Sequence, residues 1–157
     1  MSSSAGALSS FAIDREGKVW ATGYNVNGQL GLGDINQREY FTPIEDLPPI
    51  IMVSAGVEHT LFLDQDGHVW GTGSNSHNQL GFDDSPNIAS SGRGGFDEPQ
   101  GDIPGSSYMA TSGRGGLGLS NVNRTSPEMI PNLEFIVSIA AGENTSLFLD
   151  NQGRVWE

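Results

Sequence analysis

The sequence contains no cysteine and few basic residues. The absence of cysteine excludes disulfides, thiolate metal sites and thiol catalysis within these 157 residues. Seven lysines and arginines stand against nineteen aspartates and glutamates, which gives a formal net charge of −12. Because phosphate backbones and anionic lipids repel such a chain, direct DNA or RNA binding is disfavoured and we expect protein partners instead.

Long hydrophobic runs are also lacking, and no basic region precedes an apolar stretch at the start of the chain. We therefore expect no membrane segment and an intracellular location, in the cytoplasm, the nucleus or both. Charged residues make up only 17% of the sequence, whereas 22 of its residues are glycine. This composition favours short strands and tight turns over long helices.

A short segment occurs three times in the sequence. It reads FAIDREGKVWATG at residues 11–23, LFLDQDGHVWGTG at 61–73 and LFLDNQGRVWE at 147–157. An Ala-Gly pair precedes each copy, and a second element, Asn-x-x-Gly/Asn-Gln-Leu-Gly, follows the first two copies. The spacing between the second and third copies is longer because of a Gly/Ser-rich insert at residues 85–124. Because a segment that recurs in the same order indicates a repeat architecture, we interpret the three copies as repeats.

Each repeat has the features of a β-hairpin. A short apolar run ends at an Asp-x-x-Gly turn, which predicts a strand buried on both faces followed by a hairpin turn. In the next strand Lys18, His68 and Arg154 alternate with valines, so we expect these basic side chains to face water. Asn78 replaces Gly28 in the second element, which is a replacement that a left-handed backbone tolerates.

The predicted fold class is all-β, a partial β-propeller arc of about three blades, each a four-stranded antiparallel sheet. The predicted repeats are residues 1–50, residues 51–84 plus 125–140 around the flexible insert 85–124, and residues 141–157, a truncated third repeat. We expect the tryptophans to pack between blades. The residues with a predicted structural role are Gly6, Asp14, Gly17, Trp20, Gly23, Gly28, Gly31, Gly56, Asp64, Gly67, Trp70, Gly73, Gly81, Gly142, Asp150, Gly153 and Trp156.

These motifs resemble a known family. The GQLGLG run at residues 28–33, the AGxxHT run at 55–60 and the recurring DxxGxVW are similar to the repeat of the regulator of chromosome condensation family. The resemblance implies a ring of seven such repeats, of which this chain supplies less than half. We therefore expect a piece of a longer propeller, or an arc that another chain completes, and we expect self-association if the chain is this short.

No catalytic constellation is present in the sequence. The three histidines lack metal-ligand spacing, the Gly-x-Ser-x-Gly motif is absent, and GRGGLG at 113–118 lacks the strand and helix that a dinucleotide site needs. We expect no enzyme activity, no metal and no cofactor. Asp14, Asp64 and Asp150 are interpreted as turn caps. His59 is either a structural histidine or a partner contact.

The expected function is a protein interaction module. The resemblance implies regulation of a small GTPase of the Ran type, as a guanine-nucleotide exchange factor that distorts the nucleotide pocket of the GTPase. An alternative is a repeat segment of a larger HECT-type ubiquitin ligase or kinase, in which it would dock partners. The loop acids Asp34, Asp83 and Asp84 are the predicted partner contacts. Arg93 and Arg114 are further candidates if the insert is a loop that binds a partner; the alternative is that the insert is a disordered, solvated segment.

Overall fold

The computed structural model describes residues 2–82 and 122–157, and every regular element in these ranges is a β-strand. Antiparallel pairing joins the strands into three sheets that follow the order of the chain. Blade 1 contains β1 (Ser2–Ala5), β2 (Ser9–Ile13), β3 (Val19–Gly23) and β4 (Arg38–Pro43). Blade 2 contains β5 (Ile50–Ala55), β6 (His59–Asp64), β7 (Val69–Gly73) and β8 (Arg124–Met129). Blade 3 contains β9 (Ile136–Ala141), β10 (Ser146–Asp150) and β11 (Val155–Trp156).

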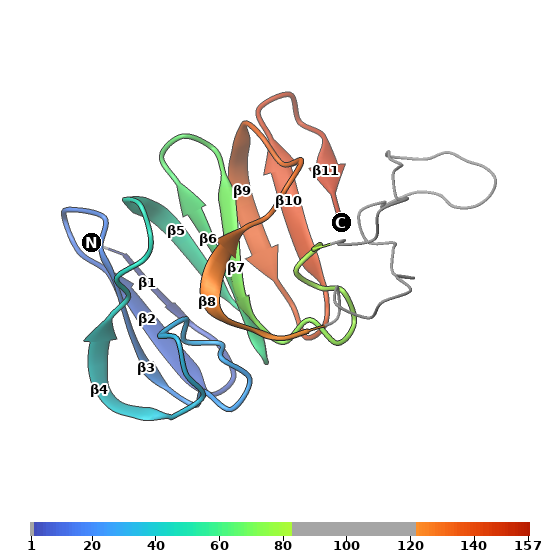
Figure 1. Ribbon diagram of the computed structural model, residues 1–157. Helices are drawn as coiled ribbons and strands as arrows, with labels where there is room; N and C mark the ends of the chain where they lie inside the picture. Colours follow the sequence, from blue (N-terminus) through green and yellow to red (C-terminus); the bar gives the residue numbers. More distant parts are fainter. Residues whose placement is uncertain (1, 83–121) are drawn as a thin grey trace.

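The three sheets stand face to face in an arc, so the predicted all-β partial propeller is confirmed (Figure 1). No helix that could cross a membrane occurs in the parts of the chain that the structure describes.

Blade 2 is completed by a strand from beyond the insert. In β8, Met129 pairs with Trp70 and Glu128 with Gly71 of β7. Residues 83–121 lie outside the described part of the chain, and they connect the third and fourth strands of this sheet. Arg124, which the sequence predicted as the last residue of the insert, is instead the first residue of β8.

The blade boundaries differ from the predicted repeat boundaries. The Ala-Gly pair was expected to open each repeat, but Ala5, Ala55 and Ala141 are the last residues of the first strands β1, β5 and β9. The pair therefore marks the turn between the first and second strands. Blade 3 consequently begins at Ile136, within the range 125–140 that was predicted to belong to the second repeat.

Apolar side chains fill the space between blades 1 and 2. Phe11, Ile13 and Val19 of blade 1 share a buried cluster with Val53 and Phe62 of blade 2. The rings of Phe11 and Phe62 meet edge to face, with centroids 6.0 Å apart and an interplanar angle of 79°. An aromatic pair in this geometry adds about 1 kcal/mol to the energy of burial.

Blades 2 and 3 meet in the same way. Leu61, Leu63 and Val69 of blade 2 share a buried cluster with Ile139 and Phe148 of blade 3. As a result β6 is buried on both faces, as predicted, whereas alternate residues of β10 are exposed.

Two of the three repeat tryptophans lie at the edges of these clusters. Trp70 packs against the cluster between blades 1 and 2, and Trp156 against the cluster between blades 2 and 3. All three tryptophans are only half-buried, so the predicted position between blades is found for Trp70 and Trp156 but without full burial.

The second repeat element folds as a left-handed turn in both copies. Gly28 has a φ of 81°, and Asn78 at the matching position has a φ of 62°. The predicted tolerance of asparagine at this position is confirmed, because Asn78 adopts the backbone that Gly28 adopts. Two residues after this position, the side chains of Leu30 and Leu80 are fully buried.

Candidate protein-docking surface

A carboxylate caps each of the three hairpin turns. One oxygen of Asp64 accepts hydrogen bonds from the backbone N–H groups of Asp66 and His68, both at 2.9 Å. The other oxygen accepts the indole N–H of Trp70 at 3.1 Å. The equivalent bonds at Asp14 and Asp150 span 2.9 to 3.1 Å. These aspartates therefore act as the turn caps that the sequence indicated, and each also holds the tryptophan of its own blade.

These hydrogen bonds keep the three carboxylates ionised. At Asp14 the indole of Trp20 is the main cause of a lowered pKa, followed by the backbone N–H of Lys18. Burial works to raise the pKa of Asp64, but the bonds from His68, Trp70 and Asp66 together lower it below 3.8. The pKa of Asp150 is lowered in the same way. Groups that are ionised and hydrogen-bonded at neutral pH serve the fold and are poor general acids.

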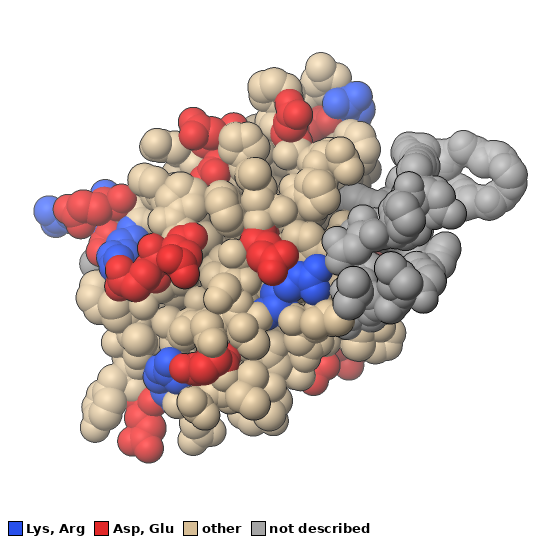
Figure 2. Space-filling model, in the orientation of Figure 1, with Lys and Arg blue, Asp and Glu red and all other residues tan. Residues whose placement is uncertain are grey.

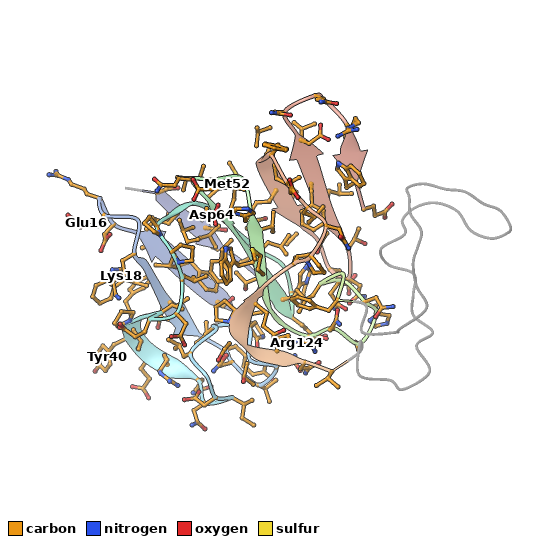
Figure 3. All side chains as sticks on the ribbon, turned by 45° about the horizontal axis from the view of Figure 1, so that its top comes forward. Glu16, Lys18, Tyr40, Met52, Asp64 and Arg124 are labelled. Atoms are coloured by element: carbon orange, nitrogen blue, oxygen red, sulfur yellow. The ribbon has the colours of Figure 1, made fainter. Side chains whose placement is uncertain are left out.

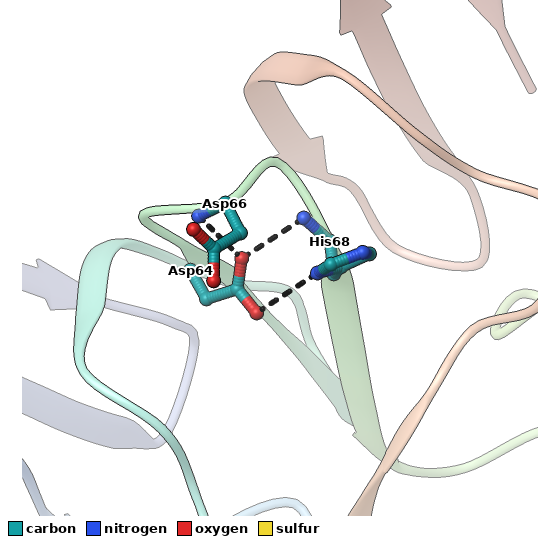
Figure 4. Close-up of side chains that lie close together, drawn as sticks. All are labelled: Asp64, Asp66 and His68. Atoms are coloured by element: carbon teal, nitrogen blue, oxygen red, sulfur yellow. Dashed lines mark hydrogen bonds and ion pairs between the residues drawn. The ribbon is translucent and has the colours of Figure 1, made fainter.

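Asp64, Asp66 and His68 place three possible metal-ligand atoms within 4.8 Å of one another in the turn of blade 2 (Figure 4). The repeats explain this proximity without a metal. His68 Nδ1 lies 3.5 Å from Asp64 Oδ2, and the matching residue of blade 3, Arg154, donates to Asp150 at 2.7 Å. In both repeats a basic side chain at this position lies beside the turn carboxylate. This pairing accounts for the proximity of His68 and Asp64 without a metal ion.

The hairpin turns share one end of the arc with the connections between blades. We call this end the turn face, formed by residues 14–18, 44–49, 64–68, 130–135 and 150–154. Its segments carry eight aspartates and glutamates against three lysines and arginines, together with His68. The hydrogen bond from Ile50 N–H to Gly17 C=O, 2.8 Å, holds a connection against a turn.

Most of the acidic charge on the turn face is exposed. Glu16, Glu45, Asp46, Asp66 and Glu134 all have exposed side chains. Red groups outnumber blue ones along the upper and left edges of Figure 2, and the side-chain view shows Glu16 projecting outward (Figure 3).

The basic side chains of this face are partly neutralised. Lys18 pairs with Glu45 at 3.1 Å and Arg154 pairs with Asp150 at 2.7 Å. The turn face is therefore an acidic surface that a basic partner would match.

His59 lies between blades and not on a surface. Its side chain is 1% exposed. The hydroxyl of Ser146 donates to the Gln79 carbonyl at 2.5 Å, so it accepts from His59 Nε2 at 3.0 Å. Burial lowers the pKa of His59 to about 4, which keeps the ring neutral at pH 7. The prediction of His59 as a partner contact is wrong, because the ring is sealed between blades 2 and 3.

Asp34 is engaged in its own loop. Arg38 donates to both oxygens of Asp34, at 2.9 and 3.2 Å, and the backbone N–H of Asn36 donates at 2.9 Å. The guanidinium of Arg38 is the first cause of a lowered pKa at Asp34. Asp34 lies at the opposite end of the arc from the turn face, and its role as a partner contact stays a prediction.

Four further predicted contacts lie outside the described residues, namely Asp83, Asp84, Arg93 and Arg114. Sequence reasoning also missed the acids Glu45, Asp46 and Glu134. These residues do not recur at matched positions, so repeat alignment gives no signal for them. They join the turn acids only because the β4–β5 and β8–β9 connections run beside the hairpin turns.

Comparison with solved structures places this fold among known propellers. Human WBSCR16 is 19% identical with a TM-score of 0.69, covering 99% of this chain and 31% of that protein. Yeast RCC1 (Prp20), solved bound to Kap60, is also 19% identical with a TM-score of 0.69, covering 98% of this chain and 30% of that protein. Prp20p from Saccharomyces cerevisiae, described with its binding properties to Gsp1p and histones, is 19% identical with a TM-score of 0.65. The match covers 98% of this chain and 32% of that protein. The chain thus spans about a third of the length of these proteins.

Sequence comparison identifies the repeats themselves. No curated protein sequence matches the chain significantly. The regulator of chromosome condensation (RCC1) repeat matches residues 16–63, and a second description of the same repeat matches residues 50–79. The first range contains the Gln-Leu-Gly element at residues 29–31, and the second contains the Asp-capped turn at residues 64–68. Residues 16–79 of the chain therefore carry repeats of the regulator of chromosome condensation (RCC1) type.

Proposed function

We propose that the chain is a non-enzymatic docking module whose turn face binds a basic surface of a partner protein. The observation that carries this proposal is the excess of acids on the turn face, which has eight acidic residues, five of them exposed, against three lysines and arginines. Blade packing fixes the loops that hold these acids, since Gly17 and Gly67 accept backbone hydrogen bonds from the following blade at 2.8 and 3.1 Å. A rigid charged surface loses little entropy on binding and steers an oppositely charged partner.

We further propose that the partner is a small GTPase and that the activity is regulation of the guanine-nucleotide-exchange type. Prp20p, a structural neighbour, is described with binding properties to Gsp1p and histones, which supports a protein partner for this chain too. In such exchange the GTPase alone binds and releases the nucleotide, so the propeller needs no cofactor of its own. Because the chain spans about a third of its neighbours, we expect binding with little stimulation of nucleotide release.

The first experiment measures binding of the full chain to a Ran-type GTPase by titration calorimetry at about 50 and 300 mM salt. Two exposed acids from different connections are reversed together, as Asp46→Lys with Glu134→Lys. The matched control reverses two acids away from the turn face, Glu39→Lys with Glu143→Lys. We expect the turn-face variant to weaken binding about tenfold or more and the control to change it little.

Several results would contradict this proposal. Absence of GTPase binding at low salt would exclude the GTPase as partner, and equal losses in both double variants would exclude the turn face. Binding to histones without binding to the GTPase would keep the docking role but refute the regulatory one. Strong stimulation of nucleotide release by this chain alone would refute the expectation that it is only part of an exchange factor.

A further inference from the structure

The turn face carries one large apolar side chain that is exposed, that of Phe135. The side chain is 61% exposed, and the backbone of this residue has a φ of 60°. The other non-glycine residues with positive φ in the described part of the chain are Asn78 and Asn132, and asparagine tolerates this region. A bulky aromatic residue is rare there, so Phe135 is an exception to the local backbone preference.

The backbone at Phe135 is held from both sides. The N–H of Asn151 donates to the Phe135 carbonyl at 2.9 Å, and the N–H of Ile136 donates to the Gly67 carbonyl at 3.1 Å. A Cβ on Gly67 would lie 3.0 Å from the Phe135 Cα. Residue 135 is therefore fixed between the hairpin turns of blades 2 and 3, and its side chain extends into solvent.

The exposure of Phe135 is a property of its position in the repeat. The matching residue between blades 1 and 2 is Pro49, which lies against Gly17 as Phe135 lies against Gly67. Pro49 is exposed as well. A side chain at this position thus stays on the surface although a blade is stacked on each side of it.

The fold gains little from the Phe135 side chain. An exposed ring buries little apolar area, and glycine would adopt a φ of 60° without steric cost. A residue that departs from the local backbone preference without a gain in packing is typical of a functional position.

Two exposed carboxylates flank this ring. Glu134 precedes Phe135 in the chain, and Asp66 precedes Gly67, the glycine beside Phe135. The face of an aromatic ring attracts a lysine ammonium or an arginine guanidinium, and a carboxylate close by pairs with the same charge. An aromatic ring between two carboxylates is therefore suited to a cationic side chain.

Arginines stack on aromatic rings at two other places in this chain. The Arg124 Cζ lies 4.6 Å from the centroid of the Phe82 ring, and the Arg154 Cζ lies 5.4 Å from that of the Trp156 ring. Among the residues that the structure describes, no lysine or arginine lies over the ring of Phe135 in this way. The face of this ring is thus accessible to a cation from another protein.

We propose that Phe135 anchors the partner on the turn face by taking one of its arginine or lysine side chains onto the ring, while Glu134 and Asp66 pair with the charge. This inference rests on the proposed docking role of the turn face and adds a residue that determines specificity. A partner with a basic surface but no cationic side chain free to stack on the ring binds more weakly.

The test titrates the full chain with a Ran-type GTPase by calorimetry and compares three substitutions at one position. Phe135→Trp should retain the affinity, because tryptophan is the best partner of a cation. Phe135→Leu keeps the apolar bulk without the aromatic face and should lower the affinity about threefold to tenfold, and Phe135→Gly should lower it about tenfold or more. The control is Leu8→Gly, which is also 61% exposed but lies at the opposite end of the arc, and it should change the affinity little.

Thermal unfolding of the same variants separates a role in binding from a role in the fold. Phe135→Gly should change the midpoint by less than about 4 °C, because it removes an exposed ring and relieves the left-handed backbone. A much larger fall in the midpoint would show that the ring serves the fold and would overturn the inference.

The binding data distinguish failure of this inference from failure of the proposed function. Equal affinities with phenylalanine and leucine at position 135 would overturn the inference, because an apolar contact would then suffice. Unchanged affinity in Phe135→Gly beside a loss in Asp46→Lys with Glu134→Lys would overturn it and leave the docking role of the turn face intact. If the GTPase does not bind, the series is titrated with core histones, for which we expect the same ranking. Absence of binding to both proteins would overturn the inference together with the docking role.

Discussion

The indole N–H of Trp70 donates a hydrogen bond to the carboxylate of Asp64 across 3.1 Å. The same bond, at the same length, joins Trp20 to Asp14 and Trp156 to Asp150. The aspartate and the tryptophan of each repeat are thus one unit, in which a capped turn is fastened to the strand that follows it. This explains why both residue types recur together in the sequence.

The first prediction concerns the turn cap. Asp64→Ala removes the acceptor of three N–H groups and should lower the free energy of unfolding by about 2–4 kcal/mol. Asp66→Ala, an exposed neighbour in the same turn, should change it by less than about 0.5 kcal/mol. Urea denaturation followed by tryptophan fluorescence measures both. Equal effects would mean that the cap contributes little.

The second prediction is a pH dependence that comes from His59. Burial lowers its folded pKa to about 4 from an ordinary 6.5, so only the unfolded chain binds a proton between these values. Stability should therefore fall as the pH decreases from 6.5 to 4, by about 3 kcal/mol in total. His59→Gln should flatten this slope, whereas His77→Gln, at an exposed position, should leave it. An unchanged slope in His59→Gln would contradict the buried neutral ring.

The third prediction concerns more acidic solutions. The folded pKa values of Asp14, Asp64 and Asp150 lie below 3.8, so their contribution is complete above that pH and is lost as the pH falls through the folded values. A second loss of stability should therefore appear below about pH 4. Asp64→Asn should reduce this second loss without altering the one between pH 6.5 and 4. Unfolding curves measured from pH 2 to pH 7 separate the two windows.

The fourth prediction exploits the matched turn positions 28 and 78. Asn78→Gly should change stability by less than about 1 kcal/mol, because glycine adopts a φ of 62° freely. Gly28→Asn should cost about 2 kcal/mol or more, although asparagine stands at position 78. A Cβ at position 28 would lie 2.7 Å from the Thr125 Cα and 2.8 Å from the Arg124 carbonyl oxygen. Thermal unfolding of the two variants gives the comparison, and equal tolerance would contradict the contact with β8.

The difference between these two positions shows where sequence reasoning succeeds and where it stops. The left-handed turn at Asn78 follows from local chemistry, and so do the Asp-capped hairpins and the fold class. The crowding of Gly28 by β8 does not, because it depends on a strand about 97 residues away that returns to the same sheet. The turn face was missed for the same reason, since Lys18 and Glu45 meet only after β4 has paired with β3.

His59 illustrates the opposite limit. From the sequence, His59 could have either a structural role or a role on the surface. The structure distinguishes the two, because His59 contacts Ser146, which in turn donates to the Gln79 carbonyl. The blade boundaries differ from the predicted repeat boundaries because Ala-Gly marks the turn between the first two strands of a blade.

Face-to-face stacking of consecutive repeats underlies the turn face and the buried His59. Nuclear Overhauser effects between the ring protons of Phe11 and Phe62 test this stacking most directly, because the two residues lie in different blades with ring centroids 6.0 Å apart. We predict clear cross-peaks between the rings, since an edge-to-face pair at this separation brings their protons close together. Their absence in the folded chain would show that blades 1 and 2 do not pack through these residues and would contradict the stacked arrangement.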